Sequence, residues 1–438
     1  MTWVKVPRSL ASFFDPVSRG WATVAGGSVA RLALGFVASL LIARALGPAG
    51  FGVFATLGAV ATVAGAVADL GLSDAGVKRI ASAWPGEPAS VRARVFFWLR
   101  ASSAALVVAI GCLVAAPLAH AVLHLPDAGL LVLALLGVLA TALSGAVSAM
   151  LQATGAFGRL TAVSLTNAGL TAVLALALAL AGRLTLVTAL VVLGIGTSLV
   201  AFGVGYRLLP PGWQLGLPAR PLLRAEGVPL LRYSGWLWVA NSCAILAAQL
   251  DLLLLQRWRG AAIAGVYALA VNLATKADLV NSSLYTVLLP AASSLAGPDA
   301  VRRYVRRSMA RGGIVALGLL VLLPLAGPLI TLVYGPAYVP SADLFRLLLL
   351  IVIFDLFATP LLLLIYHTDQ PKLLAAGDAL RVLAVLLLGA WLIPGIGATG
   401  AVVARFGARL VGTAFILAAL AWRYRRAAPV PAQRTGPS

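Results

Sequence analysis

Long uninterrupted apolar runs, separated by short polar connections, are the main pattern along this 438-residue chain. A typical run, LLVLALLGVLATAL at 130–143, lacks the alternation of a membrane β-barrel strand and predicts a membrane-spanning α-helix. Twelve runs of this kind occur, at 21–44, 50–72, 95–121, 127–151, 157–181, 184–208, 233–256, 261–290, 310–334, 341–366, 372–393 and 397–422. The pattern predicts an all-α polytopic membrane protein with about 12 transmembrane helices.

Composition and charge agree with a protein that lies mostly in the bilayer. The chain is 61% hydrophobic and only 11% charged, which excludes a water-soluble globule. Its net charge of +20 would suggest nucleic acid on a soluble surface, but the basic residues gather between the apolar runs. With the N-terminus in the cytoplasm, the cytoplasmic side carries 23 Lys and Arg residues and the opposite side five. This asymmetry predicts that both termini are cytoplasmic, with anionic membrane lipids and no nucleic acid as partners.

A weak internal repeat is visible at an offset of 213 residues. Gly47, Gly52, Val53, Phe54 and Ala55 fall on Gly260, Gly265, Val266, Tyr267 and Ala268, and later Gly182 falls on Gly395. The alternative is chance matching in a sequence rich in Ala, Gly and Val. A true repeat gives two parallel six-helix halves around a central cleft. The predicted parts are a cytoplasmic segment 1–20, bundles 21–208 and 233–422, a cytoplasmic linker 209–232 and a basic tail 423–438.

Several signatures of catalysis are missing. The sequence has no GxxxxGK[ST] loop for ATP and no DxD arrangement for a metal-dependent sugar transferase. His120 and His124 stand four apart, but no third ligand accompanies them, so they are interpreted as interfacial polar residues rather than a metal site. The two cysteines lie inside apolar runs and form no metal or redox motif. We therefore expect a non-enzyme without catalytic residues or metal.

Ionisable residues inside the bilayer are the candidates for function, because each costs about 2.5–3.5 kcal/mol at a helix centre. Asp378 and Arg381, three apart, are predicted to neutralise each other, and so are Asp74 and Lys78, four apart. The bases left as candidate substrate-binding residues are Arg31, Lys276, Arg405 and Arg409. The acids left as coupling or charge-balancing candidates are Asp251, Asp278 and Asp355. A basic surplus suits a phosphate-bearing substrate, and salt bridges between helices are the alternative.

The segment 38–81 resembles the opening of bacterial O-antigen flippase-type polysaccharide exporters, in the multidrug/oligosaccharidyl-lipid/polysaccharide (MOP) superfamily. The resemblance rests on an A-R-x-L-G-P-x-x-F-G turn, present here as Ala43, Arg44, Leu46, Gly47, Pro48, Phe51 and Gly52. The second half is similar at Asp251, Gly265, Val266, Tyr267 and Pro290. The motifs occupy about 90 residues, whereas the span count extends the likeness over nearly the whole chain. The resemblance implies a MATE-like fold.

The resemblance also implies translocation of an undecaprenyl-diphosphate-linked oligosaccharide across the bacterial cytoplasmic membrane, for O-antigen, capsule or exopolysaccharide biosynthesis. The lipid-linked oligosaccharide and other polysaccharide-assembly membrane proteins are then the expected partners, with no cofactor other than a coupling ion, H⁺ or Na⁺. The first alternative is a cation-coupled multidrug antiporter of the same fold, which would depend on Asp251 or Asp278. The second is a glycan polymerase or ligase.

Overall fold

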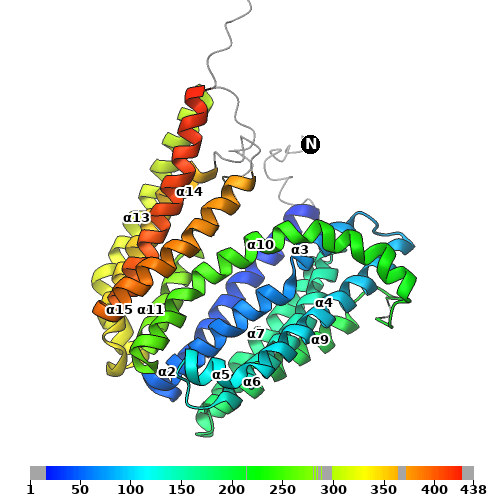
Figure 1. Cartoon of the computed structure of the whole chain (residues 1–438), viewed down its shortest axis with the longest axis horizontal. Helices are drawn as coiled ribbons and strands as arrows, with labels where there is room; N and C mark the ends of the chain where they lie inside the picture. Colours follow the sequence, from blue (N-terminus) through cyan, green and yellow to red (C-terminus); the bar gives the residue numbers. More distant parts are fainter. Residues whose placement is uncertain are drawn as a thin grey trace, which may run out of the picture. The chain divides into compact units, whose positions relative to one another are not determined.

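The computed structural model describes residues 16–213, 215–279, 281–282, 284, 288, 298–363 and 371–426, whose regular structure is entirely helical (Figure 1). The predicted N-terminal segment up to residue 15, Pro290 and the tail from residue 427 lie outside the described residues. The helices are α2 (Pro16–Asp69), α3 (Leu72–Ala81), α4 (Glu87–Leu113), α5 (Ala115–Pro117), η2 (Leu118–Val122), α6 (Ala128–Ala153), α7 (Phe157–Leu180), α8 (Leu186–Thr188), η3 (Ala189–Gly196), α9 (Thr197–Arg207), α10 (Arg220–Arg259), α11 (Ala261–Ala277), α13 (Pro298–Tyr334), η4 (Pro336–Tyr338), α14 (Ser341–Leu362) and α15 (Pro371–Arg426).

Two of these helices each contain two membrane-length segments, because a glycine interrupts them. Gly47 in α2 has φ 64° and Gly397 in α15 has φ 62°, values that L side chains rarely adopt. Eight helices in the described ranges are long and apolar enough to cross a membrane, and both interrupted helices are among them. These eight contain ten of the twelve predicted spans. The seventh span corresponds to the second part of α10, and the eighth begins with α11.

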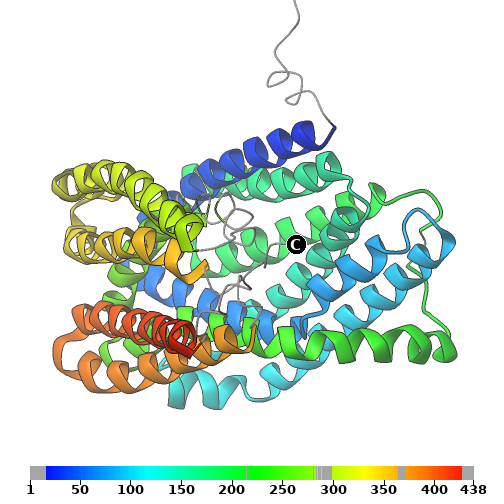
Figure 2. The same cartoon turned by 90° about the horizontal axis from the view of Figure 1, so that it is seen from above.

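By compactness the chain divides into two units. The first contains the residues up to Leu269 together with Leu329–Ser341, and the second contains Ala270–Pro328 and the residues from Ala342 onward. In the first unit α2, α4, α6, α7 and α9 pack along one another (Figures 1 and 2). Their contact faces consist of small and aliphatic side chains such as Leu57, Leu131 and Val147, which are fully buried and allow close helix approach.

The internal repeat predicted from the sequence is visible in the backbone. Gly47 and Gly260, 213 residues apart, have nearly the same dihedral angles, φ 64° with ψ 176° and φ 81° with ψ 176°. Each glycine therefore ends one span and starts the next in an equivalent way. The match of Gly182 with Gly395 is displaced, because the left-handed glycine of the second half is Gly397. The two halves thus have the same backbone geometry between their first and second spans. Before the connection of the fifth and sixth spans, the second half is two residues longer than the first.

The turn that carries the family resemblance is a structural joint in the first unit. The Ala43 carbonyl oxygen accepts a hydrogen bond of 2.8 Å from the Tyr338 hydroxyl, and the Tyr338 ring meets that of Phe51 edge-on at 6.3 Å. Arg44 donates to the Leu332 carbonyl oxygen at 2.9 Å. The segment 329–341 is therefore tied to the first unit although it comes from the second half of the sequence.

In the second unit α14 contacts both α13 and α15. Arg346 of α14 donates through Nε to the Leu323 carbonyl oxygen of α13 at 2.9 Å. On the other side Phe354 meets Phe406 of α15 edge-on, with ring centroids 5.5 Å apart. This packing brings the charged residues of α14 beside those of α15.

Candidate functional site

A polar pocket of about 300 Å³ lies inside the first unit, among α2, α6, α7 and α9. Its lining consists of small polar side chains, a few small apolar ones and one cation: Arg31, Gly35, Ser144, Ser148, Val163, Ser164, Asn167, Ala168, Thr171 and Ala201. The helices bring these groups together by simple periodicity. Ser144 and Ser148 are one turn apart on α6, while Ser164, Asn167 and Thr171 follow at intervals of three and four on one face of α7.

Arg31 is the only charged residue among the described residues that line this pocket. Its side chain is exposed, and within the described part of the chain no carboxylate forms an ion pair with it. Ser144 and Ser148 direct their hydroxyl hydrogens to carbonyl oxygens of their own helix, at 3.1 and 2.9 Å. The pocket therefore presents one guanidinium together with hydroxyl and amide groups, a combination that suits an anionic, hydroxyl-rich ligand.

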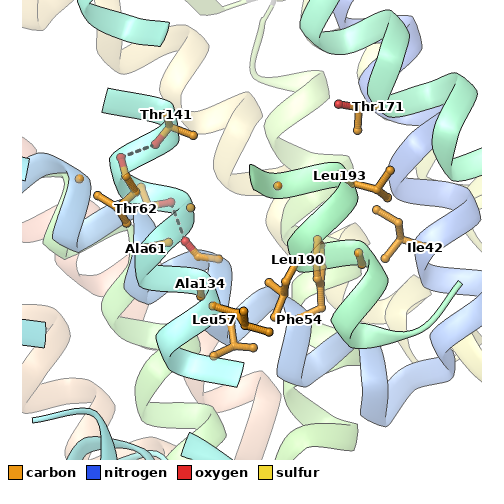
Figure 3. A pocket seen from close by; sticks show the side chains of 17 residues that line it. Ile42, Phe54, Leu57, Ala61, Thr62, Ala134, Thr141, Thr171, Leu190 and Leu193 are labelled. Atoms are coloured by element: carbon orange, nitrogen blue, oxygen red, sulfur yellow. Dashed lines mark hydrogen bonds between the residues drawn. The ribbon is translucent and has the colours of Figure 1, made fainter. Parts of the chain in front are cut away.

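A second pocket of about 360 Å³ adjoins the polar one and shares Thr171 with it. Its walls are mostly apolar, with Phe54, Leu57, Leu190 and Leu193 among them (Figure 3). Thr62 and Thr141 lie on one wall, and their hydroxyls donate to carbonyl oxygens of their own helices at 2.7 and 3.0 Å. The described residues that line this pocket include no charged side chain. The first unit therefore contains a cationic, polar pocket next to an apolar one.

The other predicted bases lie in the second unit. Lys276 donates to the side-chain oxygen of Asn272, one turn earlier on α11. Arg409 forms an ion pair of 3.1 Å with Asp355 of α14, which is the salt bridge between helices that the sequence leaves open as the alternative. The partner comes from another helix, so the spacing along one helix does not reveal it. Arg405 also lies within electrostatic reach of Asp355.

Six charged residues, from α14, α15 and the position just after α11, form a charge-balanced network. The acids are Asp278, Asp355 and Asp378, and the bases are Arg381, Arg405 and Arg409. Asp378 and Arg381 pair at 3.0 Å, which confirms the prediction from their spacing. Asp278 accepts from the amide of Asn281 at 2.8 Å, and that amide also reaches the Val352 carbonyl oxygen at 3.1 Å. The network thus balances its charge internally.

Asp251 belongs to the first unit and is almost fully buried, with 1% of its surface exposed. It accepts a hydrogen bond of 2.6 Å from the hydroxyl of the buried Tyr267. Because Asp251 lies on α10 and Tyr267 on α11, this contact joins the two helices on either side of Gly260. The carboxylate lines neither of the two pockets described above.

Two side chains outside the pockets contact α10, and one of them departs from its prediction. Lys78 does not pair with Asp74 but donates to the hydroxyl of Tyr233 at 2.9 Å. His124 contacts the Arg257 carbonyl oxygen through Nδ1 at 3.0 Å. Both side chains therefore attach α10 to earlier elements of the first unit.

The sequence reasoning included Arg31 but missed its polar neighbours. Ser164, Asn167 and Thr171 are the available signal, since polar residues at positions i, i+3 and i+7 of an apolar helix lie on one face. The other candidates do not line the polar pocket with Arg31. Asp251 lies in the same unit but is hydrogen-bonded to Tyr267. The second unit contains the rest, namely Lys276, Asp278, Asp355, Arg405 and Arg409.

The sequence matches a known protein family. Residues 41–343 match the family described as "Polysaccharide biosynthesis protein", which is more than half of the chain. The chain belongs to this polysaccharide biosynthesis family. This family agrees with the resemblance to polysaccharide exporters that the turn at 43–52 carries. No curated protein sequence matches it.

Several solved structures that resemble this chain are transporters. "Lipid II flippase MurJ, inward closed conformation" has a TM-score of 0.72 at 11% identity, covering 91% of this chain and 87% of that one. An inward-facing MATE family multidrug resistance transporter of the MOP superfamily has a TM-score of 0.67 at 13% identity, covering 90% of this chain and 95% of that one. The MATE multidrug transporter DinF-BH has a TM-score of 0.61 at 17% identity, covering 96% of each chain. These likenesses confirm the predicted fold.

Proposed function

We propose that this protein moves an undecaprenyl-diphosphate-linked oligosaccharide from the inner to the outer leaflet of the bacterial cytoplasmic membrane. The product would serve the biosynthesis of a polysaccharide such as O-antigen, capsule or exopolysaccharide. Family membership and the transporter fold support an export step over a polymerase or ligase reaction. The observation that carries the proposal is the polar pocket, where a guanidinium and several hydroxyl and amide groups are gathered without a carboxylate among the described lining residues.

The chemistry of the pocket fits the two parts of such a headgroup. The Arg31 guanidinium donates several hydrogen bonds in one plane, which matches the oxygens of a diphosphate. Ser164 and Asn167 offer donors and acceptors for sugar hydroxyls. A diphosphate-sugar cannot cross about 30 Å of hydrocarbon without a polar passage, so a protein that hydrates and neutralises it removes the main barrier.

The decisive experiment measures flipping of a fluorescent undecaprenyl-diphosphate-linked oligosaccharide in proteoliposomes. We expect Arg31→Ala to lower the rate at least about tenfold, because truncation removes charge-assisted hydrogen bonds to the phosphate. Arg31→Lys should keep part of the rate. Arg183→Ala is the matched control, since Arg183 is exposed and lines neither pocket. A wild-type rate in Arg31→Ala would remove Arg31 from the site, and no flipping by the wild type would overturn the proposed function.

We further propose that transport is secondary and coupled to H⁺ or Na⁺, with Asp278, Asp355 and Asp251 as the candidate carboxylates. Carboxylates inside the bilayer can exchange a proton or a cation as their environment changes. Imposed pH and Na⁺ gradients across the proteoliposomes, applied one at a time, test this. The rate should respond to one of the two gradients and lose that response in the corresponding Asp→Asn variant. Equal rates under all gradients would overturn the coupling.

The charge of the transported substrate distinguishes a drug antiporter from the proposed flippase. Two of the similar structures are multidrug transporters, so the fold permits this function. A cationic drug should be repelled by Arg31 and depend on Asp251 or Asp278. Efflux of a cationic fluorescent dye from vesicles that increases in Arg31→Ala would favour the antiporter. Competition between undecaprenyl diphosphate and the flipped substrate, without dye efflux, would favour the flippase.

The proposed orientation has both termini in the cytoplasm, where the basic loops face anionic lipid and other polysaccharide-assembly membrane proteins. Single cysteines introduced at Ser90 and at Arg183 test it in intact cells, after Cys112 and Cys243 are replaced by alanine. A membrane-impermeant maleimide should label Arg183→Cys and spare Ser90→Cys. The reverse pattern would overturn the orientation.

A further inference from the structure

The sixth span of the first unit contains an unusual π-helical stretch, η3 (Ala189–Gly196), between α8 and α9. π-helical turns are rare and frequently mark functional sites, because their backbone has an alternative α-helical register. Four residues in η3, Ala189, Leu190, Leu193 and Gly194, line the apolar pocket. The stretch therefore forms part of a pocket wall.

The end of η3 shows how the π register is held. The backbone N–H of Thr197 donates to the Val192 carbonyl oxygen, five residues earlier, instead of to Leu193, four residues earlier. The Leu193 carbonyl oxygen accepts the Thr197 hydroxyl at 2.7 Å instead. Thr197 is 1% exposed, so without this hydroxyl the Leu193 carbonyl would lose a partner in a buried site.

The hydroxyl of Thr197 also meets α7. Thr171 Oγ1 lies 3.2 Å from Thr197 Oγ1 and 2.8 Å from the Asn167 carbonyl oxygen. Its single hydrogen can point to only one of these acceptors at a time. Thr171 lines both pockets. A ligand that accepts a hydrogen bond from the Thr171 hydroxyl therefore takes away the hydrogen bond that this hydroxyl donates to Thr197.

We propose that Thr171 senses occupancy of the polar pocket and transmits it through Thr197 to the register of η3. When the hydroxyl of Thr171 turns to a ligand, the Thr197 hydroxyl is released and the last π turn converts to α. Moving one residue out of the π stretch rotates the preceding turns by about 100° around the helix axis. Leu190 and Leu193 then leave their present positions, and the apolar pocket changes shape as the polar one fills. Thr171 and Thr197 are positioning residues in this scheme, which rests on the proposed function only for the identity of the ligand.

Hydrogen–deuterium exchange of the peptide 189–198 in the purified protein tests the register claim without any ligand. Thr197→Val is isosteric but removes the hydroxyl, so the α register should be favoured at least about tenfold and the exchange pattern of this peptide should change. Thr197→Ser keeps the hydroxyl and should retain the wild-type pattern. Thr62→Val is the matched control, because the Thr62 hydroxyl lines the apolar pocket but bonds only within its own helix. A Thr197→Val pattern equal to that of the wild type would overturn the register switch.

Undecaprenyl diphosphate, added as the probe, tests the coupling. Wild type should bind it and show the exchange change of Thr197→Val. Thr171→Val lacks the hydrogen bond to Thr197 from the start, so it should show the altered pattern without ligand, bind with at most a few-fold loss of affinity and show no further change in η3. Thr171→Ser should behave as wild type. If Thr171→Val still transmits the change, the relay through Thr171 is wrong. If the wild type does not bind the probe, the proposed function fails, while the ligand-free comparison of Thr197→Val with Thr197→Ser still decides the register claim.

Discussion

Gly52 and Gly265, the paired glycines of the internal repeat, meet where α2 crosses α11. A methyl group built on Gly52 would lie 1.8 Å from the Ala261 carbonyl oxygen, and one on Gly265 would lie 1.9 Å from the Pro48 carbonyl oxygen. These distances are far below van der Waals contact, and the obstructing atoms are backbone. The two helices therefore approach each other through bare backbone, at equivalent positions of the two halves.

This crossing predicts a strong stability effect of a single methyl group. Gly52→Ala or Gly265→Ala should lower the free energy of unfolding by about 3 kcal/mol or more, since overpacking against backbone has no side chain to yield. Thermal unfolding in detergent measures it. Gly203→Ala in α9 is the control, because a Cβ there meets no atom within 4 Å. Comparable losses in Gly52→Ala and Gly203→Ala would contradict the tight crossing.

Glu226 attaches the beginning of α10 to α3 and α4. Its carboxylate pairs with Arg79 at 2.8 Å and with Arg92 at 3.3 Å, and each side chain is about a quarter exposed. These first turns of α10 lie within the predicted linker 209–232, so part of that linker is a docked helix.

We expect Glu226→Gln to weaken this attachment by about 1 kcal/mol, a value typical of partly exposed pairs. Trypsin should then cleave after Arg224 several-fold faster in detergent. Glu87→Gln offers a control, because no ion pair of Glu87 occurs within the described ranges. Unchanged cleavage in Glu226→Gln would show that apolar packing alone holds the helix.

The sequence predicts the membrane spans well because the hydrophobic pattern and the short connections leave little freedom of interpretation. Gly47 and Gly260 illustrate this: matching glycines at a fixed offset require the same backbone geometry in both halves. The turn motif is informative about family, and the structure shows why it is silent about substrate. Ala43, Phe51 and Gly52 form the joint between spans and do not line the polar pocket.

The candidate site is only partly predictable, because charge is conspicuous in an apolar sequence whereas small polar residues are not. Arg31 stands out by its charge, while Ser164 and Asn167 do not stand out from the many small residues around them. The pairing of Arg409 with Asp355 is not predictable either, since which helices lie side by side is decided by packing rather than by spacing along one helix.

The contact between Asp251 and Tyr267 predicts a structural role that can be separated from ion coupling. Tyr267→Phe removes a hydrogen bond to a buried carboxylate and should cost about 1.5–3 kcal/mol of unfolding free energy. Asp251→Asn should cost less, because an amide still accepts from the Tyr267 hydroxyl. Thermal unfolding and gradient-driven flipping are measured on the same variants. A stable Asp251→Asn protein that loses its response to a gradient would instead assign the coupling ion to Asp251.

The pair of Asp355 and Arg409 gives the corresponding test in the second unit. Asp355 is largely buried, with 11% of its side chain exposed, whereas the Arg409 side chain is 41% exposed, so we expect each single neutralisation to cost about 1–2 kcal/mol, between surface and buried values. Removing both charges together in Asp355→Asn/Arg409→Gln should restore most of that stability, because neither partner is left unpaired. The flipping rate of the double variant then distinguishes a structural role of the pair from a role of Asp355 in ion coupling. If the pair only holds α14 against α15, the double variant should recover its rate together with its stability. If Asp355 carries the coupling ion, the double variant should be stable and still fail to respond to the gradient.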